Sequence, residues 1–245
     1  DSLIDQALEH SAQAYEKHNQ TSFLDRAQKI NNVADYLEDN AQSLGEIITN
    51  EMGKPVAQAV GEVKKCASLC RYYADNAERL LQDKDIEVDN AKALVKYLPI
   101  GTVFAVMPWN FPFWQVFRFA VPALMAGNVC LLKHASNVPQ CALEIERIFN
   151  QCGFNEGEFQ TLMISSSQVE GVIADPRVKA VTLTGSEGAG AQVAAAAGEN
   201  LKKSVLELGG SDPFIIMPSA DFEKTLELAV KGRVQNNGQT CIASK

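Results

Sequence analysis

The chain has 245 residues, of which 46% are hydrophobic and 21% are charged. This composition supports a sizeable hydrophobic core and excludes an intrinsically disordered protein. The net charge of −8, without clustered lysines or arginines, argues against nucleic acid as a partner. No apolar run approaches the ~20 residues that cross a bilayer, and the first residues lack the features of a signal peptide. We therefore expect a soluble, cytoplasmic protein without a membrane partner.

The first part of the chain, residues 1–82, has a helical pattern. Apolar residues recur at spacings of three and four over residues 24–37 and 56–81. The tripeptide Gly53-Lys54-Pro55 separates these two stretches, because glycine and proline end helices. Residues 84–98 then predict a β-hairpin, since two short apolar segments flank a polar turn.

From Gly101 the pattern changes to compact apolar runs that alternate with helical stretches. Runs that are apolar on both faces are typical of parallel strands buried between two helical layers. The pattern therefore predicts a doubly wound, Rossmann-like α/β core over residues 100–208, in which ligands bind beyond the carboxyl ends of the strands. The predicted strands are 103–107, 129–132, 161–164, 180–183 and 205–206, and the predicted crossover helices are 138–152 and 187–199.

The last part of the chain begins after Gly210. The apolar run 214–217 predicts one further strand, and Asp221 is expected to cap a helix that runs to about Gln235. No later run offers this strand a partner, so its edge would be exposed.

The six cysteines show neither paired metal-ligand spacing nor the density of a disulfide scaffold. Cys66 and Cys70 lie four residues apart on a predicted helix, but no second pair or nearby histidine completes a zinc site. We expect no metal site, and buried free thiols for every cysteine except Cys241.

Three side chains with catalytic chemistry lie in distinctive peptides. A thiol in an activating environment is a nucleophile, a carboxylate at the end of a buried strand suits a general base, and an amide in a stiff turn suits an oxyanion hole. Each also has an ordinary alternative, namely a buried cysteine, a glutamate that caps a helix or pairs with lysine, and an asparagine that completes its own turn. The peptides are Asn236-Asn237-Gly238-Gln239-Thr240-Cys241, Leu206-Glu207-Leu208-Gly209-Gly210 and Pro108-Trp109-Asn110-Phe111-Pro112.

Together, in this order and approximate spacing, the three peptides resemble those of the aldehyde dehydrogenase superfamily. The resemblance runs from about Leu3 to the last residue. It implies an NAD(P)-binding domain over residues 1–208, in which the hairpin 84–98 joins a neighbouring subunit of a homo-oligomer. It also implies that residues 209–245 open a catalytic domain that is truncated here, because members of the family are much longer.

The resemblance assigns a role to each of the three side chains. It implies that Cys241 forms a covalent adduct with the aldehyde, and that the Asn110 side chain and the backbone N–H of Cys241 hold the resulting oxyanion. Glu207 would activate the water that hydrolyses the thioester. The cofactor-binding residues that the resemblance implies are Pro108, Trp109, Lys133, Ser136, Gly185, Ser186 and Leu208.

Two turns bear on the choice of cofactor. In the family, the lysine that matches Lys133 bonds the adenosine ribose or a 2′-phosphate, and members selective for NAD tend to have a glutamate where this chain has Ser136. We therefore expect NAD or NADP, with NADP accepted or even preferred. We expect the neighbouring His134 to be a solvated loop residue. The glycine-rich turn at Gly185 and Ser186 offers free N–H groups to a pyrophosphate, although its order is not G-x-G-x-x-G.

Arg118 lies eight residues after Asn110, within an apolar and aromatic stretch. A cation in such surroundings needs a partner, and arginine is suited to holding a carboxylate through two parallel bonds. Arginine at this offset resembles the succinate-semialdehyde dehydrogenases, in which it grips the remote carboxylate of the substrate. The alternative is an ion pair with a local aspartate or glutamate.

The resemblance therefore implies an NAD(P)-dependent oxidation of an aldehyde, with succinate semialdehyde as the expected substrate. A cofactor-binding fragment without turnover is the main alternative, because the family's substrate funnel lies mostly in the second half of its fold. A structural protein with an enzyme's fold is a third possibility, which the joint presence of Cys241, Glu207 and Asn110 disfavours.

Overall fold

The computed structural model describes residues 2–244 and begins with four helices. Ser22 and Asp25 form a reciprocal capping box at the start of the second helix. Gly53, with φ of 75°, ends the third helix. Pro55 precedes the fourth helix, so the predicted break at 53–55 is confirmed. The helices are α1 Ser2–His18, α2 Phe23–Asp39, α3 Ala41–Met52 and α4 Val56–Leu80.

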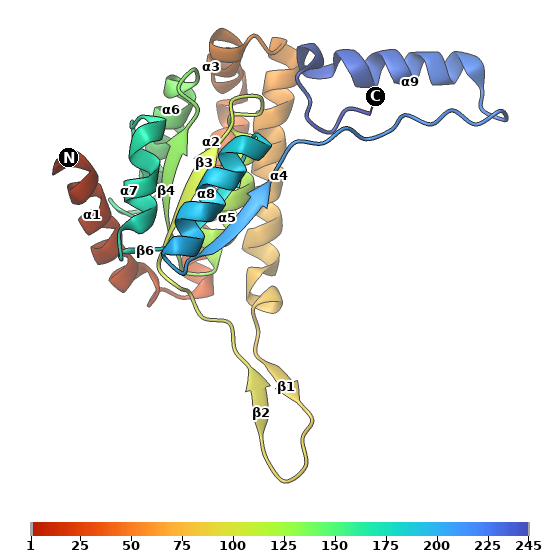
Figure 1. Ribbon diagram of the computed structural model, residues 1–245. Coiled ribbons are helices and arrows are strands. Elements are labelled where there is room, and N and C mark those ends of the chain that lie inside the picture. The colour runs from red at the N-terminus through yellow and green to blue at the C-terminus, as the bar shows by residue number, and fades with distance from the viewer. Residues whose placement is uncertain (1, 245) are drawn as a thin grey trace.

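The predicted hairpin follows as strands β1 (Lys84–Ile86) and β2 (Ala93–Val95), which pair antiparallel. It projects from the rest of the molecule as a narrow arm (Figure 1). Ile86 and Leu94 are each about half exposed there. The arm therefore presents apolar side chains to solvent, and its role in joining subunits stays a prediction.

The centre of the molecule is a five-stranded parallel sheet in the order β5-β4-β3-β6-β7. The predicted doubly wound α/β fold class is confirmed. The strand predicted at 161–164 lies slightly earlier in the chain, at Phe159–Thr161. The chain runs outward from β3 to β5 and then returns to the other side of β3, so β3 and β6 flank the topological switch point. The strands are β3 Thr102–Met107, β4 Val129–His134, β5 Phe159–Thr161, β6 Val178–Thr184 and β7 Lys203–Glu207.

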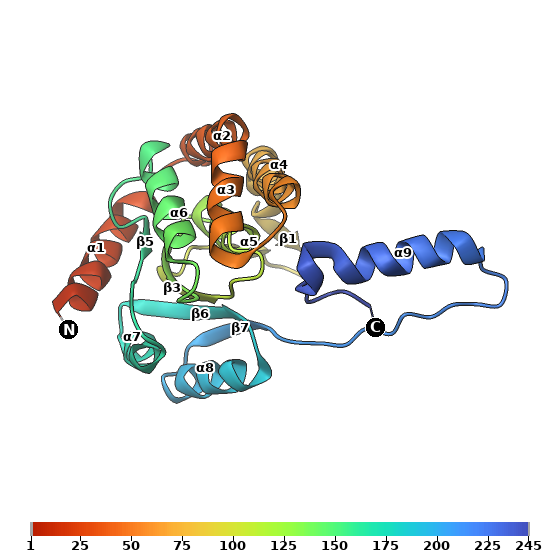
Figure 2. The same ribbon diagram turned by 90° about the horizontal axis from the view of Figure 1, so that it is seen from above.

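Helices cover both faces of the sheet (Figure 2). One apolar core lies between the sheet and helices α2 to α6, and includes the stacked rings of Phe117, Phe149 and Phe159. A second core joins Leu8 of α1 and Phe104 of β3 to helices α7 and α8. Among the helices of residues 2–244, none combines the length and apolarity that a membrane crossing requires. The crossover helices are α5 Trp114–Met125, α6 Pro139–Gln151, α7 Val169–Ala174, with a 3-10 turn at Ser166–Gln168 before it, and α8 Glu187–Glu199.

The chain after β7 leaves the sheet and forms a second arm (Figure 1). The predicted strand at 214–217 is wrong, because these residues are extended and exposed and no described strand pairs with them. Asp221 caps α9 (Phe222–Val234) as predicted, its Oδ1 accepting from the Lys224 N–H at 2.9 Å. None of the α9 side chains is buried, and a 3-10 turn, Gln235–Gly238, follows.

Candidate active site

The predicted site residues gather at the carboxyl edge of the sheet. Met107 of β3 pairs in register with His134 of β4, and Thr184 of β6 pairs with Glu207 of β7. Because the strands are parallel, the turns that follow them leave from the same edge. The topology thus brings the turns at 108, 135 and 185 and the end of β7 to one side of the molecule.

Asn110 connects the turn after β3 to the peptide that carries Cys241. Its Nδ2 donates to the backbone oxygen of Gln239 at 2.9 Å, and its own backbone oxygen accepts from Asn236 Nδ2 at 2.9 Å. These reciprocal bonds join segments that lie 126 and 129 residues apart in the chain. An amide group has two N–H donors, so one remains for another acceptor. The turn residues Pro108 and Trp109 are partly exposed beside it.

The peptide before Cys241 has an irregular backbone that specific bonds hold in place. Asn236 and Asn237 have φ of 55° and 53°, a left-handed conformation that asparagine tolerates better than most residues. The Asn236 N–H donates to Gln58 Oε1 at 2.7 Å, and Asn237 Nδ2 donates to the backbone oxygen of Gly53. Cys241 is exposed, whereas the other five cysteines are buried, as predicted. The exposed thiol therefore follows a loop anchored to α3 and α4.

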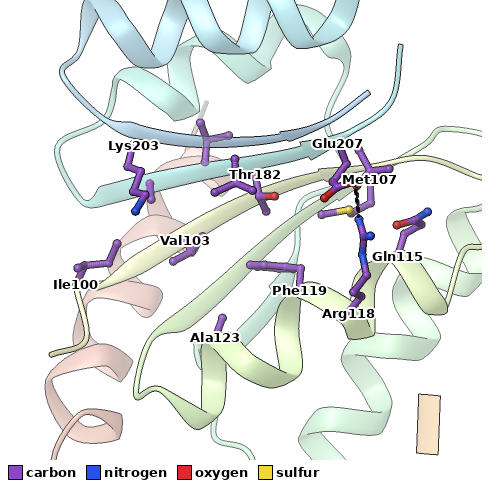
Figure 3. Close-up of a pocket in the computed structure, with 14 residues that line it drawn as sticks. Ile100, Val103, Met107, Gln115, Arg118, Phe119, Ala123, Thr182, Lys203 and Glu207 are labelled. Carbon is purple, nitrogen blue, oxygen red and sulfur yellow. Dashed lines mark hydrogen bonds and ion pairs between the residues drawn. The ribbon is translucent and has the colours of Figure 1, made fainter. Parts of the chain in front are cut away.

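Glu207 and Arg118 face each other in a pocket of about 440 Å³ between α5 and the strands β3, β6 and β7 (Figure 3). Arg118 Nη2 lies 3.8 Å from Glu207 Oε2 and 3.4 Å from Thr184 Oγ1. The expectation that Glu207 ends a buried strand is wrong, because β7 is an edge strand without a buried residue and the Glu207 side chain is 56% exposed. The alternative of an acidic partner for Arg118 is present, although this partner is distant in sequence rather than local.

The turn after β4 carries the two residues expected near the adenosine ribose. Lys133 is half-buried, and burial lowers the pKa of its ammonium group. Its Nζ donates to the backbone oxygen of His134 at 3.2 Å, and within residues 2–244 no carboxylate forms an ion pair with it. Ser136 is exposed in the same turn. A cation and a hydroxyl group thus lie at this strand end, and no described carboxylate pairs with the cation.

The prediction that His134 is a solvated loop residue is wrong. Its side chain is buried, its Nδ1 accepts from the Ala135 N–H at 2.9 Å, and its Nε2 lies 2.9 Å from the backbone oxygen of Pro112. Nε2 therefore carries the proton and donates to Pro112. Burial lowers the pKa of His134, which keeps the ring neutral. The imidazole links the turn after β4 to the turn that contains Asn110.

The turn between β6 and α8 provides an anion-binding geometry. Ser186 caps α8, its Oγ accepting from the Ala189 N–H at 3.3 Å, and Gly185 donates its N–H to the backbone oxygen of Glu207 at 3.0 Å. The N-terminus of α8 points its remaining amides toward the carboxyl edge of the sheet. A side chain at Gly190 would place its Cβ only 2.4 Å from Leu208 Cδ2, so a glycine at this position lets Leu208 pack on α8.

Several residues that contact the Asn110 peptide, the residues just after it or the nucleophile peptide lie outside the three sequence motifs or were not assigned a role. Asn236 lies inside the nucleophile peptide, but the sequence did not predict the hydrogen bond between Asn236 and Asn110. Lys54, Gln58 and Glu62 gave no signal beyond the helix break at 53–55. Within residues 2–244, no cluster of histidine, cysteine, aspartate and glutamate has the arrangement of a metal site.

Comparison with known proteins identifies the family of the chain. The model of the family described as "Aldehyde dehydrogenase family" matches residues 1–245. The chain belongs to this family. The resemblance of the three peptides is thereby confirmed over the range that the sequence predicted.

Curated relatives of this aldehyde dehydrogenase family member carry a more specific name. A "Probable succinate-semialdehyde dehydrogenase [NADP(+)]" from Synechocystis sp. is 52% identical over 242 residues, which are 99% of this chain and 53% of that protein. A "Succinate-semialdehyde dehydrogenase [NADP(+)] 1" from Mycobacterium tuberculosis is 54% identical over 248 aligned residues, covering 100% of this chain and 54% of that protein. The chain thus spans about half the length of the curated relatives it matches.

A solved structure also matches this chain over about half of its own length. The succinic semialdehyde dehydrogenase from Streptococcus pyogenes, crystallised with NADP⁺, superposes with a TM-score of 0.97 at 39% sequence identity. The superposition covers 100% of this chain and 54% of that chain. The fold of residues 2–244 is therefore that of about half of the chain of a solved succinic semialdehyde dehydrogenase.

Proposed function

We propose that the chain carries the cofactor site and the nucleophile of an NADP-dependent succinate-semialdehyde dehydrogenase. The observation that carries this proposal is the pair of reciprocal bonds between the Asn110 turn and the 236–239 loop that precedes Cys241. They hold an amide donor and an exposed thiol on neighbouring segments beside the switch point of the sheet. The names of the relatives support the reaction and the substrate.

In the proposed chemistry, the Cys241 thiolate adds to the aldehyde carbon and forms a covalent thiohemiacetal. The free N–H of the Asn110 amide and the backbone N–H of Cys241 donate to the oxyanion that develops. NADP⁺, when bound, would supply the acceptor for the hydride that leaves the former aldehyde carbon, and a thioester on Cys241 would remain. Glu207 would then take a proton from a water molecule that attacks the thioester carbonyl, and the carboxylic acid would leave as the Cys241 thiolate is released.

The residues at the cofactor side fit a dinucleotide with a 2′-phosphate. Lys133 offers a cation without an acidic partner among the described residues, and Ser136 offers a hydroxyl where a carboxylate would repel the phosphate. The amides at the N-terminus of α8, beside Gly185 and Ser186, suit the pyrophosphate. Pro108, Trp109 and Leu208 would line the remainder of this site. The NADP⁺ of the Streptococcus pyogenes structure supports this assignment.

Arg118 would bind the remote carboxylate of the substrate. Its contact with Glu207 is long, and both side chains are more than a third exposed, so the pair is weak and leaves the guanidinium free to bind a second anion. Arg118→Leu should lower kcat/KM for succinate semialdehyde. The expected loss of transition-state stabilisation is about 2–4 kcal/mol, the range for a charged group left unpaired. An uncharged aldehyde of similar length should lose little. Equal losses for both would make Arg118 an ion-pair residue that acts on Glu207.

A second candidate function is cofactor binding without turnover by these 245 residues alone. The exposed arm after β7, in which no α9 side chain is buried, favours it. The test compares the 245-residue chain with a full-length enzyme, meaning a protein of the relatives' length that contains these residues. NADP titration and NADPH formation are measured for both. Binding by both with turnover only by the full-length enzyme supports the second candidate for the shorter chain.

Two further properties are proposed for an enzyme of the relatives' length. We propose a homo-oligomer in which the hairpin β1–β2 contacts a neighbouring subunit, since Ile86 and Leu94 are about half exposed on it. The mass of the enzyme in solution, measured with and without residues 84–95, tests this. The cytoplasmic location stays a prediction from sequence.

A further inference from the structure

A buried ion pair lies beneath the turn that carries Asn110. Lys54 and Glu62 are 1% and 5% exposed, and Lys54 Nζ bonds Glu62 Oε2. Lys54 follows Gly53 in the turn between α3 and α4, and Glu62 lies two turns into α4. Burial lowers the pKa of the Lys54 ammonium and raises that of the Glu62 carboxyl, while each charge opposes the shift of the other. Two charges have thus been taken out of water, an arrangement that is weak evidence for stability and invites another explanation.

Lys54 contacts the Asn110 turn, and Glu62 contacts the residues that follow it at the start of α5. Glu62 Oε1 accepts from the backbone N–H groups of Phe113 and Trp114 at 3.0 and 2.9 Å, at the start of α5. Lys54 Nζ lies 3.9 Å from the centre of the Phe111 ring, the residue next to Asn110. A carboxylate and an ammonium group therefore fix the residues immediately after Asn110.

The same segment also holds the peptide before Cys241. Gly53 supplies the backbone oxygen that accepts from Asn237, and Gln58 supplies the Oε1 that accepts from the Asn236 N–H at 2.7 Å. Residues 53–62, hereafter the 53–62 segment, thus contact both peptides whose relative placement the chemistry needs. An oxyanion hole works only when its donors are already in place as charge develops.

We propose that the 53–62 segment is a positioning element of the active site, and that the Lys54–Glu62 pair orients the Asn110 amide relative to Cys241. Neither residue contacts the reacting atoms in this proposal; both act through Asn110. The inference rests on the proposed function, because it assigns the pair a role in that reaction. It explains why an ion pair occupies a place where apolar side chains would pack as well.

The test is a double-mutant cycle in the full-length enzyme. Glu62→Gln keeps the shape of the side chain and one acceptor oxygen but removes the charge. It should lower kcat about 10- to 100-fold with KM changed less than about 3-fold, because a displaced donor affects the transition state more than substrate binding. Asn110→Ala should lower kcat about 100- to 1000-fold. If Glu62 acts through Asn110, Glu62→Gln should change kcat less than about 3-fold in the Asn110→Ala background.

The matched control is Glu38→Gln, which removes a carboxylate that pairs with Arg71 at 2.8 Å on the exposed surface of α2. It should leave kcat unchanged in both backgrounds. If Glu62→Gln does not fold, the double variant Lys54→Met/Glu62→Gln removes both buried charges, which preserves folding better than removing one. The same loss of kcat, again absent in the Asn110→Ala background, is expected from it.

The outcomes separate the two proposals. Equal loss from Glu62→Gln in both backgrounds, or no loss in a folded variant, overturns the positioning role while leaving the proposed function intact. An Asn110→Ala enzyme with unchanged kcat instead contradicts the proposed function itself.

Discussion

Residues 102–207 and residues 208–244 adopt their structures for different physical reasons. In the first region, strands and crossover helices bury apolar side chains on both faces of the sheet. In the second, Asn236 and Ala243 are the buried residues among those described, and α9 has none. Burial of apolar surface therefore fixes the strand ends that carry Asn110 and Glu207. A few polar bonds fix the loop before Cys241.

This difference shows how the site depends on two kinds of interaction. The sheet provides a rigid edge, and its positions tolerate little change because a close-packed core transmits any change in volume. The 236–239 loop has no such core, so the bonds to Gln58, Asn110 and Gly53 must set its position. Variants in the buried core of the first region should therefore affect stability, and variants in the loop should affect activity.

The largest effect should come from the loop region and leave the core untouched. Cys241→Ala in the full-length enzyme should lower aldehyde oxidation by a factor on the order of 10⁴ or more, because the covalent route is lost. NADP affinity, measured by fluorescence titration, and the unfolding midpoint should stay close to those of the parent enzyme. Cys152→Ala, at a buried thiol, is the control and should retain turnover. Substantial oxidation by the Cys241→Ala enzyme would contradict the assigned nucleophile.

The second-largest expected effect is on stability and comes from the buried Glu158 carboxylate in the first region. Burial alone would raise the pKa of Glu158, but the His18 imidazole, whose Nδ1 lies 3.4 Å from Oε1, and hydrogen bonds from Asn155 lower it to about 2. A carboxylate whose folded pKa is below its ordinary value stabilises the fold above the ordinary value, and this stabilisation is lost as the pH falls from about 4.5 toward 2. Lys29 Nζ lies 3.1 Å from the same carboxylate.

Glu158→Gln should therefore lower the free energy of unfolding at pH 7 by about 3 kcal/mol, and the difference from the parent should shrink as the pH falls below about 4.5. Urea unfolding of the chain at pH 7 and pH 3 measures both values. Glu38→Gln, at the exposed surface pair, should change stability by less than about 1 kcal/mol. A constant difference at both pH values would mean that protonation of Glu158 is not the cause.

Asn236→Ala tests the loop without touching the thiol. It removes the donor to the Asn110 backbone oxygen and places alanine at φ of 55°, which alanine disfavours. An acceptor left unpaired costs about 1–3 kcal/mol, so kcat of the full-length enzyme should fall roughly 5- to 150-fold. The core variant Phe149→Leu should instead lower the unfolding midpoint while kcat per folded molecule changes little. If the two variants show the same profile, the distinction between the regions fails.

The sequence predicted the first region better than the second for a physical reason. An apolar run such as 103–107 records burial on both faces, so the strands and their order of appearance could be found from the pattern. The run 214–217 has the same local pattern, yet it is not a strand because a strand also requires a hydrogen-bonded partner. The prediction that the strand before Glu207 is buried was wrong for a related reason, since the sequence does not show that β7 lies at the edge of the sheet.

The candidate site also depends on contacts between distant residues, which local sequence patterns do not show. The peptides around Cys241, Glu207 and Asn110 marked the chemistry, but periodicity carries no information about contacts such as that between Gln58 and Asn236, 178 residues apart. Lys54 and His134 were missed because a charged or polar side chain is buried only by its partners, and those partners lie elsewhere in the chain.

The smallest predicted effect concerns the cofactor side of the first region, where a rigid strand end should make charge the deciding variable. Ser136→Glu places a carboxylate in the turn that also holds Lys133, beside the proposed position of the 2′-phosphate. At an exposed position, repulsion between like charges is worth about 1 kcal/mol, so the dissociation constant of NADP should rise roughly 5- to 10-fold. NAD lacks this phosphate, so its dissociation constant should change less than about 2-fold.

The control Ser136→Gln introduces a side chain of similar size without the charge, and it should leave both dissociation constants near those of the parent. Titration of the 245-residue chain with each cofactor, at low and high salt, measures the difference. Equal weakening of NAD and NADP, or a loss that persists with glutamine, would place the 2′-phosphate away from Ser136.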